Sequence, residues 1–275
     1  MTILNSESGN TLIKQKLKNN DIFSVGRVGI TEITTSYFHD KGLSIPQGWM
    51  HALIKQAGVY GDCIDEFHNE YINAIKTSDV NIFWNINNLI EFQTHIFNTY
   101  SPTSIKTENR AVEPFYFNYP WSEELKNKTV LVIHPFTDTI NTQFKHRDKI
   151  WSNDKILPQF DLKLYKPVQS IGDYTQRHTS WLESLNYMKQ GIANIQFDIA
   201  LLGCGAYGMP LCNFIKTTLN KTAIYIGGGL QLLFGIRGKR WDDQDASKFY
   251  NSSWTRPNIK ETPVDYQVVE GGSYW

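Results

Sequence analysis

The chain has 275 residues, 41% of them hydrophobic, which is enough to bury a full core in one α/β domain, residues 1–275, or in two halves, residues 1–120 and 121–275. Lys and Arg together number 27, as do Asp and Glu, so no overall charge attracts nucleic acid or an anionic membrane. The three cysteines are odd in number and scattered, which argues against a disulfide framework and a zinc site. No apolar run reaches transmembrane length, and residues 1–20 are too polar for a signal peptide, so we expect a cytoplasmic protein.

Helices and strands alternate in the first half. Residues 1–20 predict a polar helix, and residues 22–25 predict a short strand that leads into Gly-Arg-Val-Gly-Ile-Thr-Glu. A helix is expected to begin near Thr31, the next to cover residues 61–77, and a strand to follow at 80–84. The aromatic segment 109–119 predicts extended chain.

The second half continues this alternation. Residues 129–133 form a near-continuous apolar run, typical of a strand buried on both faces, and a helix ending near His146 is expected after it. Residues 162–168 predict a strand and residues 174–190 a helix. The whole pattern predicts a Rossmann-like α/β fold, with a mainly parallel sheet flanked by helices on both faces.

A glycine loop follows one apolar run of this half. Residues 197–202 lead into Gly203-x-Gly205-x-x-Gly208 and a helical pattern, and residues 222–226 form the next apolar run. This order places free backbone N–H groups at a helix N-terminus, where an anion is stabilised. It predicts a nucleotide-type ligand. The alternative is a tight turn whose glycines serve packing alone.

The segment after the second apolar run departs from a dinucleotide site. Such a site has Asp or Glu about 20 residues after the glycine loop, to bind ribose hydroxyls. Here residues 226–229 are Ile-Gly-Gly-Gly, so NAD is disfavoured, while a nucleotide held by other contacts remains open. Arg237, Lys239 and Arg240 follow, where they suit a diphosphate or form a surface patch.

Ligands of parallel sheets bind beyond the carboxyl ends of the strands, and these candidates are expected to meet at that edge. The catalytic candidates are Glu32, Asp138 and His134. The candidates for binding a nucleotide ligand are Arg27, Gly29, Gly203, Gly205, Tyr207, Gly208, Gly227, Gly228, Arg237, Lys239 and Arg240.

Each polar candidate also has a structural interpretation. Glu32 is either a general base or metal ligand, or a first-turn helix carboxylate that favours the helix dipole. Arg27 either binds phosphate or pairs with a carboxylate. Asp138 stands between two threonines before a helix, which favours a helix cap. His134 follows a buried strand and is catalytic or structural.

Two sets of motifs carry a family resemblance. Residues 26–32 resemble the Arg-x-Gly-Asp-Gly-Glu signature of GT-D-type glycosyltransferases (DUF1792), as residues 200–226 resemble that family's later strand, glycine loop, helix and strand. The chain also resembles a bacterial family that accompanies surface-polysaccharide genes. The motifs of that family stand here as Glu113-Pro-Phe-Tyr, Val130-Leu-Val-Ile-His-Pro-Phe, Gly203-Cys-Gly-Ala-Tyr-Gly, the segment 232–241 and the terminal Gly271-Gly-Ser-Tyr-Trp.

The resemblance implies transfer of a sugar from a nucleotide-diphosphate donor to a glycan or other hydroxyl acceptor, with an Asp-x-Glu pair engaging the donor through a metal. Ile30 stands in place of that Asp, which argues against a divalent metal. We therefore expect no metal ligands, with Arg27 and the basic cluster stabilising the departing diphosphate and Glu32 deprotonating the acceptor.

Two alternatives to a glycosyltransferase remain, namely another nucleotide-binding enzyme on this scaffold and a non-catalytic member of a glycan-assembly complex. The expected partners are a nucleotide sugar and an acceptor, not nucleic acid, and self-association into a homo-oligomer is left open. The last residues include Tyr274 and Trp275, so the C-terminal tail is expected to pack back onto the domain, over the ligand edge or a subunit interface.

Overall fold

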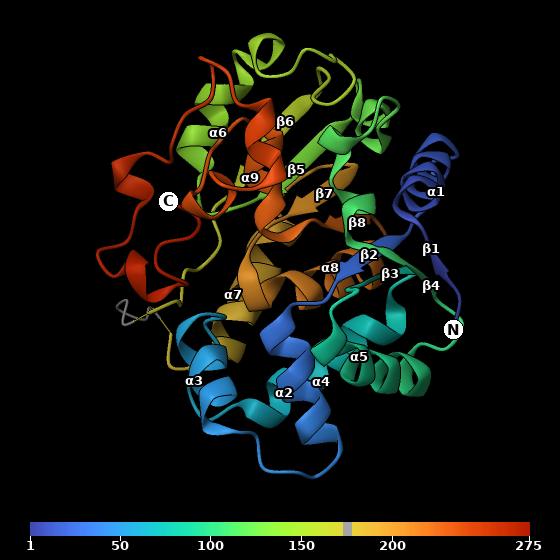
Figure 1. Ribbon diagram of the computed structural model, residues 1–275, viewed down its shortest axis with the longest axis vertical. Coiled ribbons are helices and arrows are strands. Elements are labelled where there is room, and N and C mark those ends of the chain that lie inside the picture. The colour runs from blue at the N-terminus through green and yellow to red at the C-terminus, as the bar shows by residue number, and fades with distance from the viewer. Residues whose placement is uncertain (173–177) are drawn as a thin grey trace.

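A computed structural model describes residues 1–172 and 178–275. Its sheet has eight strands, all paired in parallel, in the order β1-β4-β3-β2-β8-β7-β5-β6 (Figure 1). The strands are β1 (Ile3–Leu4), β2 (Ser24–Arg27), β3 (Val80–Phe83), β4 (Ile105–Glu108), β5 (Thr129–Ile133), β6 (Asp161–Tyr165), β7 (Ile199–Leu202) and β8 (Thr222–Tyr225).

Both halves of the sequence contribute to this one sheet. The first four strands belong to residues 1–120 and the last four to residues 121–275, and they join where β2 pairs with β8. Because every pair is parallel, all the strands end at the same edge of the sheet.

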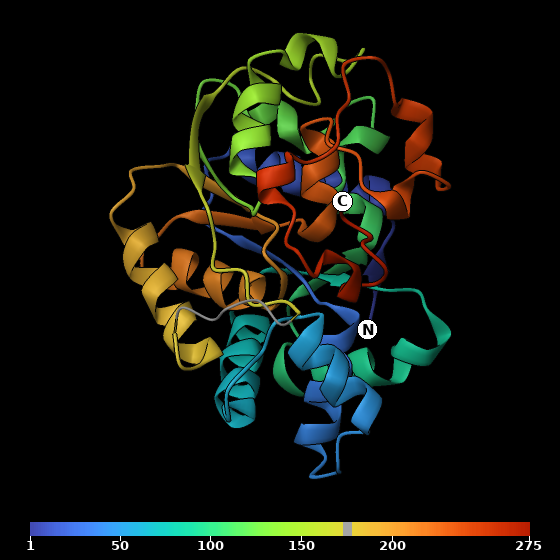
Figure 2. The ribbon, with the colours of Figure 1, turned by 90° about the vertical axis from the view of Figure 1, so that its left-hand side faces the viewer.

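Helices cover both faces of the sheet (Figures 1 and 2). Buried residues of α1, α6 and α9 belong to the hydrophobic cluster on one face, and those of α2, α3, α4, α5, α7 and α8 belong to the cluster on the other. The helices are α1 (Ser6–Lys18), α2 (Ile30–Asp40), α3 (Gln47–Lys55), α4 (Ile64–Thr77), α5 (Asn87–Tyr100), α6 (Thr137–Phe144), α7 (Trp181–Ala193), α8 (Gly208–Thr217) and α9 (Leu230–Leu233).

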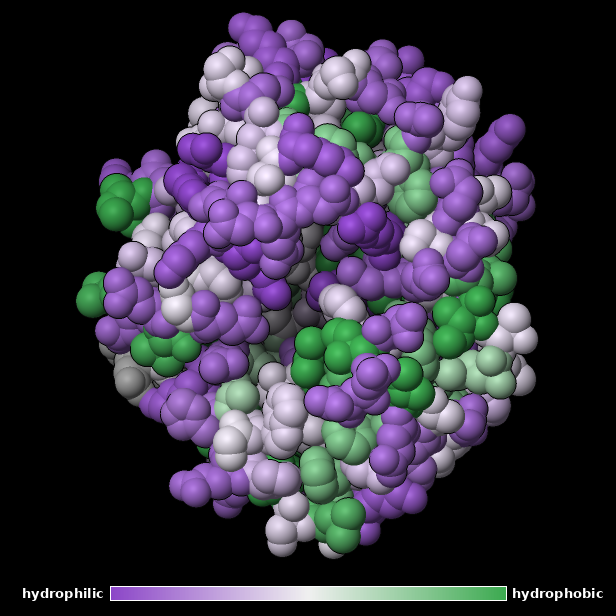
Figure 3. Space-filling model, in the orientation of Figure 1, coloured by the Kyte–Doolittle hydropathy of each residue, from purple (hydrophilic) through white to green (hydrophobic). Residues whose placement is uncertain are grey.

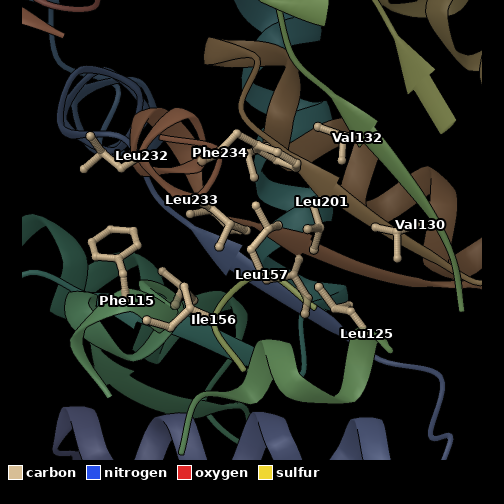
Figure 4. Packing of buried hydrophobic residues seen from close by; sticks show 14 of the residues in the cluster. Phe115, Leu125, Val130, Val132, Ile156, Leu157, Leu201, Leu232, Leu233 and Phe234 are labelled. Carbon is tan, nitrogen blue, oxygen red and sulfur yellow. The ribbon is translucent and has the colours of Figure 1, made fainter. Parts of the chain in front are cut away.

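Alternate residues of the central strands enter the two cores. Val130 and Val132 of β5 face the first cluster, whereas Leu131 and Ile133 face the second, and all four are fully buried. In Figure 4, Val130 and Val132 lie among other buried side chains of the first cluster, from β7, from α9 and from loops. The period of two and the burial on both faces explain why this strand reads as a continuous apolar run.

The Rossmann-like, mainly parallel α/β fold predicted from the sequence is confirmed, and one local prediction is wrong. The segment 109–119 is not extended, because it forms short 3-10 turns at Asn109–Val112 and Pro114–Tyr116. Its aromatic content comes from packing, since Phe115 is buried in the first core. The helix expected over residues 174–190 is found as α7, and its first four positions lie outside the described residues.

Within the described residues, no helix has both the length and the apolar character needed to cross a membrane.

Candidate functional site

The carboxyl edge of the sheet carries two neighbouring hollows. A polar cleft of about 220 Å³ lies where β2, β3, β4 and β8 end. A cavity of about 100 Å³ lies where β5 and β7 end. We name them the arginine cleft and the switch-point cavity, and Gly228 lines both. Figure 3 shows the surface hollowed near its centre, close to where β2 leads into α2 in Figure 1.

The switch-point cavity owes its name to the chain's direction across the sheet. From β5 the chain moves outward to β6, whereas from β7 it moves the opposite way to β8. The crevice between two such strands is where open parallel sheets commonly bind ligands. His134 and Gly203, the first residues after β5 and β7, both line it.

Arg27 is the central cation of the arginine cleft. Its Nε donates to Oδ1 of Asn109 at 2.9 Å, and its guanidinium lies 4.5 Å from the ring centroid of Trp84. These contacts hold the planar head at the end of β2 while the cleft beside it stays open. A guanidinium fixed in this way is suited to bidentate binding of phosphate.

Two further arginines and one carboxylate also line the cleft. Arg110 pairs with Asp245 at 3.1 Å, and Arg240 pairs with Glu270 at 3.4 Å. Glu113 lines the same cleft, and burial raises the pKa of its carboxyl while Arg27, Arg110 and Arg240 oppose that rise. The cleft thus holds three guanidinium groups around one cleft-facing carboxyl group. Two of them are paired with carboxylates outside the lining, and Arg27, for which the described residues show no such ion pair, favours an anionic ligand.

The triple glycine after β8 makes room for three side chains. A Cβ on Gly227 would lie 2.5 Å from Arg27 Nη1, on Gly228 it would lie 2.5 Å from the Tyr274 ring, and on Gly229 it would lie 3.2 Å from Glu113 Oε1. Gly227 also has φ +72°, a backbone conformation that favours glycine. These glycines therefore let the cleft side chains approach the backbone.

The glycine loop after β7 is closely packed. A Cβ on Gly203 would lie 2.8 Å from the carbonyl oxygen of Gly227 and 2.8 Å from the His134 ring. Gly205, with φ +58°, accepts a hydrogen bond from the Tyr225 hydroxyl at 2.8 Å, and Tyr207 stacks on Trp181 within the core. Gly203, Gly205 and Tyr207 line the switch-point cavity, but the packing interpretation of the glycines accounts for these contacts.

Gly208 gives a test of this packing. A Cβ there would lie 2.3 Å from the Tyr225 ring. This ring is buried, and its hydroxyl donates a hydrogen bond to the carbonyl oxygen of Gly205. We expect Gly208→Ala to lower the free energy of unfolding by about 1–3 kcal/mol, the usual effect of overpacking. Chemical denaturation should show this loss.

Gly48→Ala is the matched control. Gly48 lies in α3 with nothing within 4 Å of its Cβ position, so alanine there should be neutral or slightly stabilising. Equal stability of the two variants would contradict the packing account of Gly208.

His134 is a buried wall of the switch-point cavity. Its Nδ1 accepts a hydrogen bond from the backbone N–H of Phe136 at 3.0 Å, so the neutral ring carries its proton on Nε2. Burial lowers the pKa of His134 to about 3. The ring is therefore neutral near pH 7 and is able to donate a hydrogen bond but not to act there as an acid in its charged form.

Glu32 is buried and forms part of neither lining. Its carboxyl folds back over Gly29 in the first turn of α2, where a Cβ on Gly29 would lie 2.1 Å from Oε2. Only 8% of Glu32 is exposed, and burial is the main cause that raises its pKa. This placement matches the interpretation of Glu32 as a first-turn helix carboxylate.

The same geometry bears on the metal that the GT-D resemblance implies. Glu32 is buried and lines neither hollow, and Ile30 offers no ligand atom. Across residues 1–172 and 178–275, no three His, Cys, Asp or Glu side chains are grouped to hold a metal ion. The residues at this position therefore do not fit a divalent metal.

The C-terminal tail lies over this edge, as expected from its sequence. The backbone N–H groups of Lys239 and Arg240 donate to the carbonyl oxygens of Trp275 and Ser273, and Arg240 Nη1 donates to the Tyr274 hydroxyl at 3.0 Å. Tyr274 and Trp275 line the switch-point cavity. Figures 1 and 2 show this segment, in red, between α6 and α3.

Removing this tail should therefore weaken the fold. We expect deletion of residues 271–275 to lower the free energy of unfolding by roughly 2 kcal/mol, because two large, half-buried aromatic rings lose their contacts. A thermal scan of the truncated and full-length chains measures the effect. An unchanged midpoint would show that the tail is not needed for stability.

Besides Glu32, three charged residues that were predicted as site residues line neither hollow, and neither do Gly29, Gly208 and Gly227. Asp138 is exposed in the first turn of α6, and its predicted role as a helix cap is wrong, because Glu261 accepts from the backbone N–H groups of Asp138 and Thr139. Arg237 lies over the ring of Tyr250, 5.6 Å from its centroid, and lines neither hollow. Lys239 donates from Nζ to the carbonyl oxygen of Gly271 and so holds the tail.

The lining residues of the arginine cleft that were not predicted as site residues include Trp84, Asn109, Arg110 and Glu113. They follow β3 and β4, so recognising that strand β4 ends before Asn109 would have placed three of them at the ligand edge. Glu113 opens a motif already noted in the sequence, but no role was assigned to it.

Comparisons with known proteins add evidence on the fold. No family model and no curated protein matches the sequence. A selenomethionine-substituted structure of domain of unknown function 1792 (DUF1792) is similar to this chain with a TM-score of 0.50 and 14% sequence identity, covering 95% of this chain and 92% of that one. The chain therefore shares the DUF1792 fold over nearly its full length, as its sequence motifs indicated.

Proposed function

We propose that this chain is a glycosyltransferase that moves a sugar from a nucleotide-diphosphate donor to a glycan or other hydroxyl acceptor, in surface-polysaccharide synthesis. The observation that carries the proposal is the arginine cleft, where Arg27, Arg110 and Arg240 surround an opening at the ligand edge of a Rossmann-like sheet. Cations in a preformed site stabilise the negative charge of a departing diphosphate without a metal. Similarity to the DUF1792 fold supports the same class of reaction by analogy.

The test is release of nucleoside diphosphate or monophosphate from a panel of nucleotide sugars, with EDTA present. We expect one donor class to be consumed, slowly with water and faster with a suitable hydroxyl acceptor. Donors that bind without being consumed under any condition would contradict a transferase.

That contradicting outcome would favour a second candidate, a non-catalytic member of a glycan-assembly complex. Ile30 in place of the family's Asp and the burial of Glu32 favour it, because both remove the pair that the resemblance assigns to the donor. In that case nucleotide binding in the arginine cleft would persist without turnover.

A further inference from the structure

Glu113 is the acidic side chain that faces the arginine cleft. It lies between two short 3-10 turns, Asn109–Val112 and Pro114–Tyr116, at the end of β4. Gly229 lacks the side chain that would crowd its Oε1, so the carboxyl lies beside Gly229, while Arg27 lies beside Gly227 of the same triple glycine. Glu32, in contrast, lines neither hollow.

The surroundings of Glu113 suit a proton acceptor. Burial disfavours its charged form, which raises its pKa, whereas Asn109 favours the charged form and opposes that rise. The arginines partly offset that rise. A bound diphosphate would neutralise part of their positive charge, so the pKa of Glu113 would then rise further. A base works best when its pKa lies near the working pH, so ligand binding would prepare this carboxylate to take a proton.

We propose that Glu113 is the general base of the transfer, an inference that rests on the proposed glycosyltransferase function. As the acceptor oxygen forms its bond to C1 of the donor sugar, its proton passes to the Glu113 carboxylate. The bond between C1 and the phosphate oxygen breaks, and its electron pair leaves with the nucleoside diphosphate, whose new negative charge faces Arg27 and Arg240. The protonated Glu113 then returns its proton to solvent.

The experiment compares Glu113→Gln with wild type in two assays, binding of the free nucleoside diphosphate and consumption of the nucleotide sugar by water or acceptor. We expect turnover to fall by about 100-fold or more, the usual contribution of a general base. Binding should stay equal or tighten, because the variant removes a negative charge from an anion site. The acidic limb of the wild-type pH–rate profile should disappear in the variant.

Two further variants separate catalysis from folding. Glu113→Ala should regain turnover when formate is added, and Glu113→Asp should keep part of the activity. Glu91→Gln is the matched control, because Glu91 is exposed on α5, accepts a hydrogen bond from Tyr37 and lines neither hollow. It should behave as wild type.

The outcomes distinguish this inference from the proposed function. Turnover of Glu113→Gln within threefold of wild type, with binding intact, would overturn the role of Glu113 and leave the transferase in place. Loss of binding together with turnover, without formate rescue, would make Glu113 a positioning residue for the arginines and would also overturn the proposal. A wild-type chain that consumes no nucleotide sugar would overturn both.

Discussion

Replacing Arg27 with alanine is expected to weaken binding of the nucleoside diphosphate by about 10-fold to 100-fold. A hydrogen bond to a charged group contributes about 1.5–3 kcal/mol, and Arg27 is the cation that Asn109 and Trp84 hold in place at the end of β2. Arg27→Lys should recover only part of the affinity, since an ammonium group cannot bind phosphate bidentately. Titration calorimetry with each variant measures the change.

Arg147→Ala serves as the control for this prediction. Arg147 lies after α6 against Phe144 and forms no part of the arginine cleft, so its loss removes one positive charge without touching the site. If both variants weakened binding equally, the effect would come from overall charge and not from a fixed guanidinium at Arg27.

The second large effect is a loss of folding stability at acidic pH. The pKa of His134 is about 3 in the folded chain, against an ordinary value of 6.5, because the buried ring resists protonation. Between these two pKa values the unfolded chain therefore binds a proton at His134 that the folded chain does not bind. The stability tied to this group is complete above pH 6.5 and is lost as pH falls from 6.5 toward 3, by about 1.4 kcal/mol per pH unit.

The pH dependence of unfolding in wild type and His134→Gln tests this. His68, whose pKa burial lowers to about 4, acts in the same direction in both proteins, so the difference between them reports on His134. Wild type should lose its stability advantage over the variant as pH falls from 6.5 to 4. Parallel curves would show that His134 has the same pKa in the folded and the unfolded chain, which would contradict the account.

Much of the fold could be predicted from the sequence, because the strands that matter most are buried on both faces. The runs at 129–133, 197–202 and 222–226 became β5, β7 and β8 for this reason. Strand β4 was missed because its residues Ile105–Glu108 read Ile-Lys-Thr-Glu, with a single apolar residue in four positions. Helix α3 was missed because Leu53 is its one fully buried residue, which leaves no periodic apolar face to read.

The site was harder to predict, because glycines that admit a phosphate and glycines that admit a side chain look alike in sequence. Both uses need an absent Cβ, and only the fold shows that Arg27, Tyr274 and Glu113 fill the space over residues 227–229. The basic cluster also divides in space, since Arg240 lines the cleft while Arg237 lies over Tyr250. That Arg27, Glu113 and Arg240, which are distant in sequence, line the same cleft cannot be predicted from the local sequence pattern.

The most direct test of the account is calorimetry of wild type with UDP, GDP, CMP and NAD, each in EDTA and then with manganese. The arginine cleft predicts that one nucleoside diphosphate binds in EDTA, that manganese adds little, and that NAD does not bind. Binding only with manganese would contradict the account, because carboxylates and not the arginines would then hold the donor. Absence of binding by all four nucleotides would contradict the account as well.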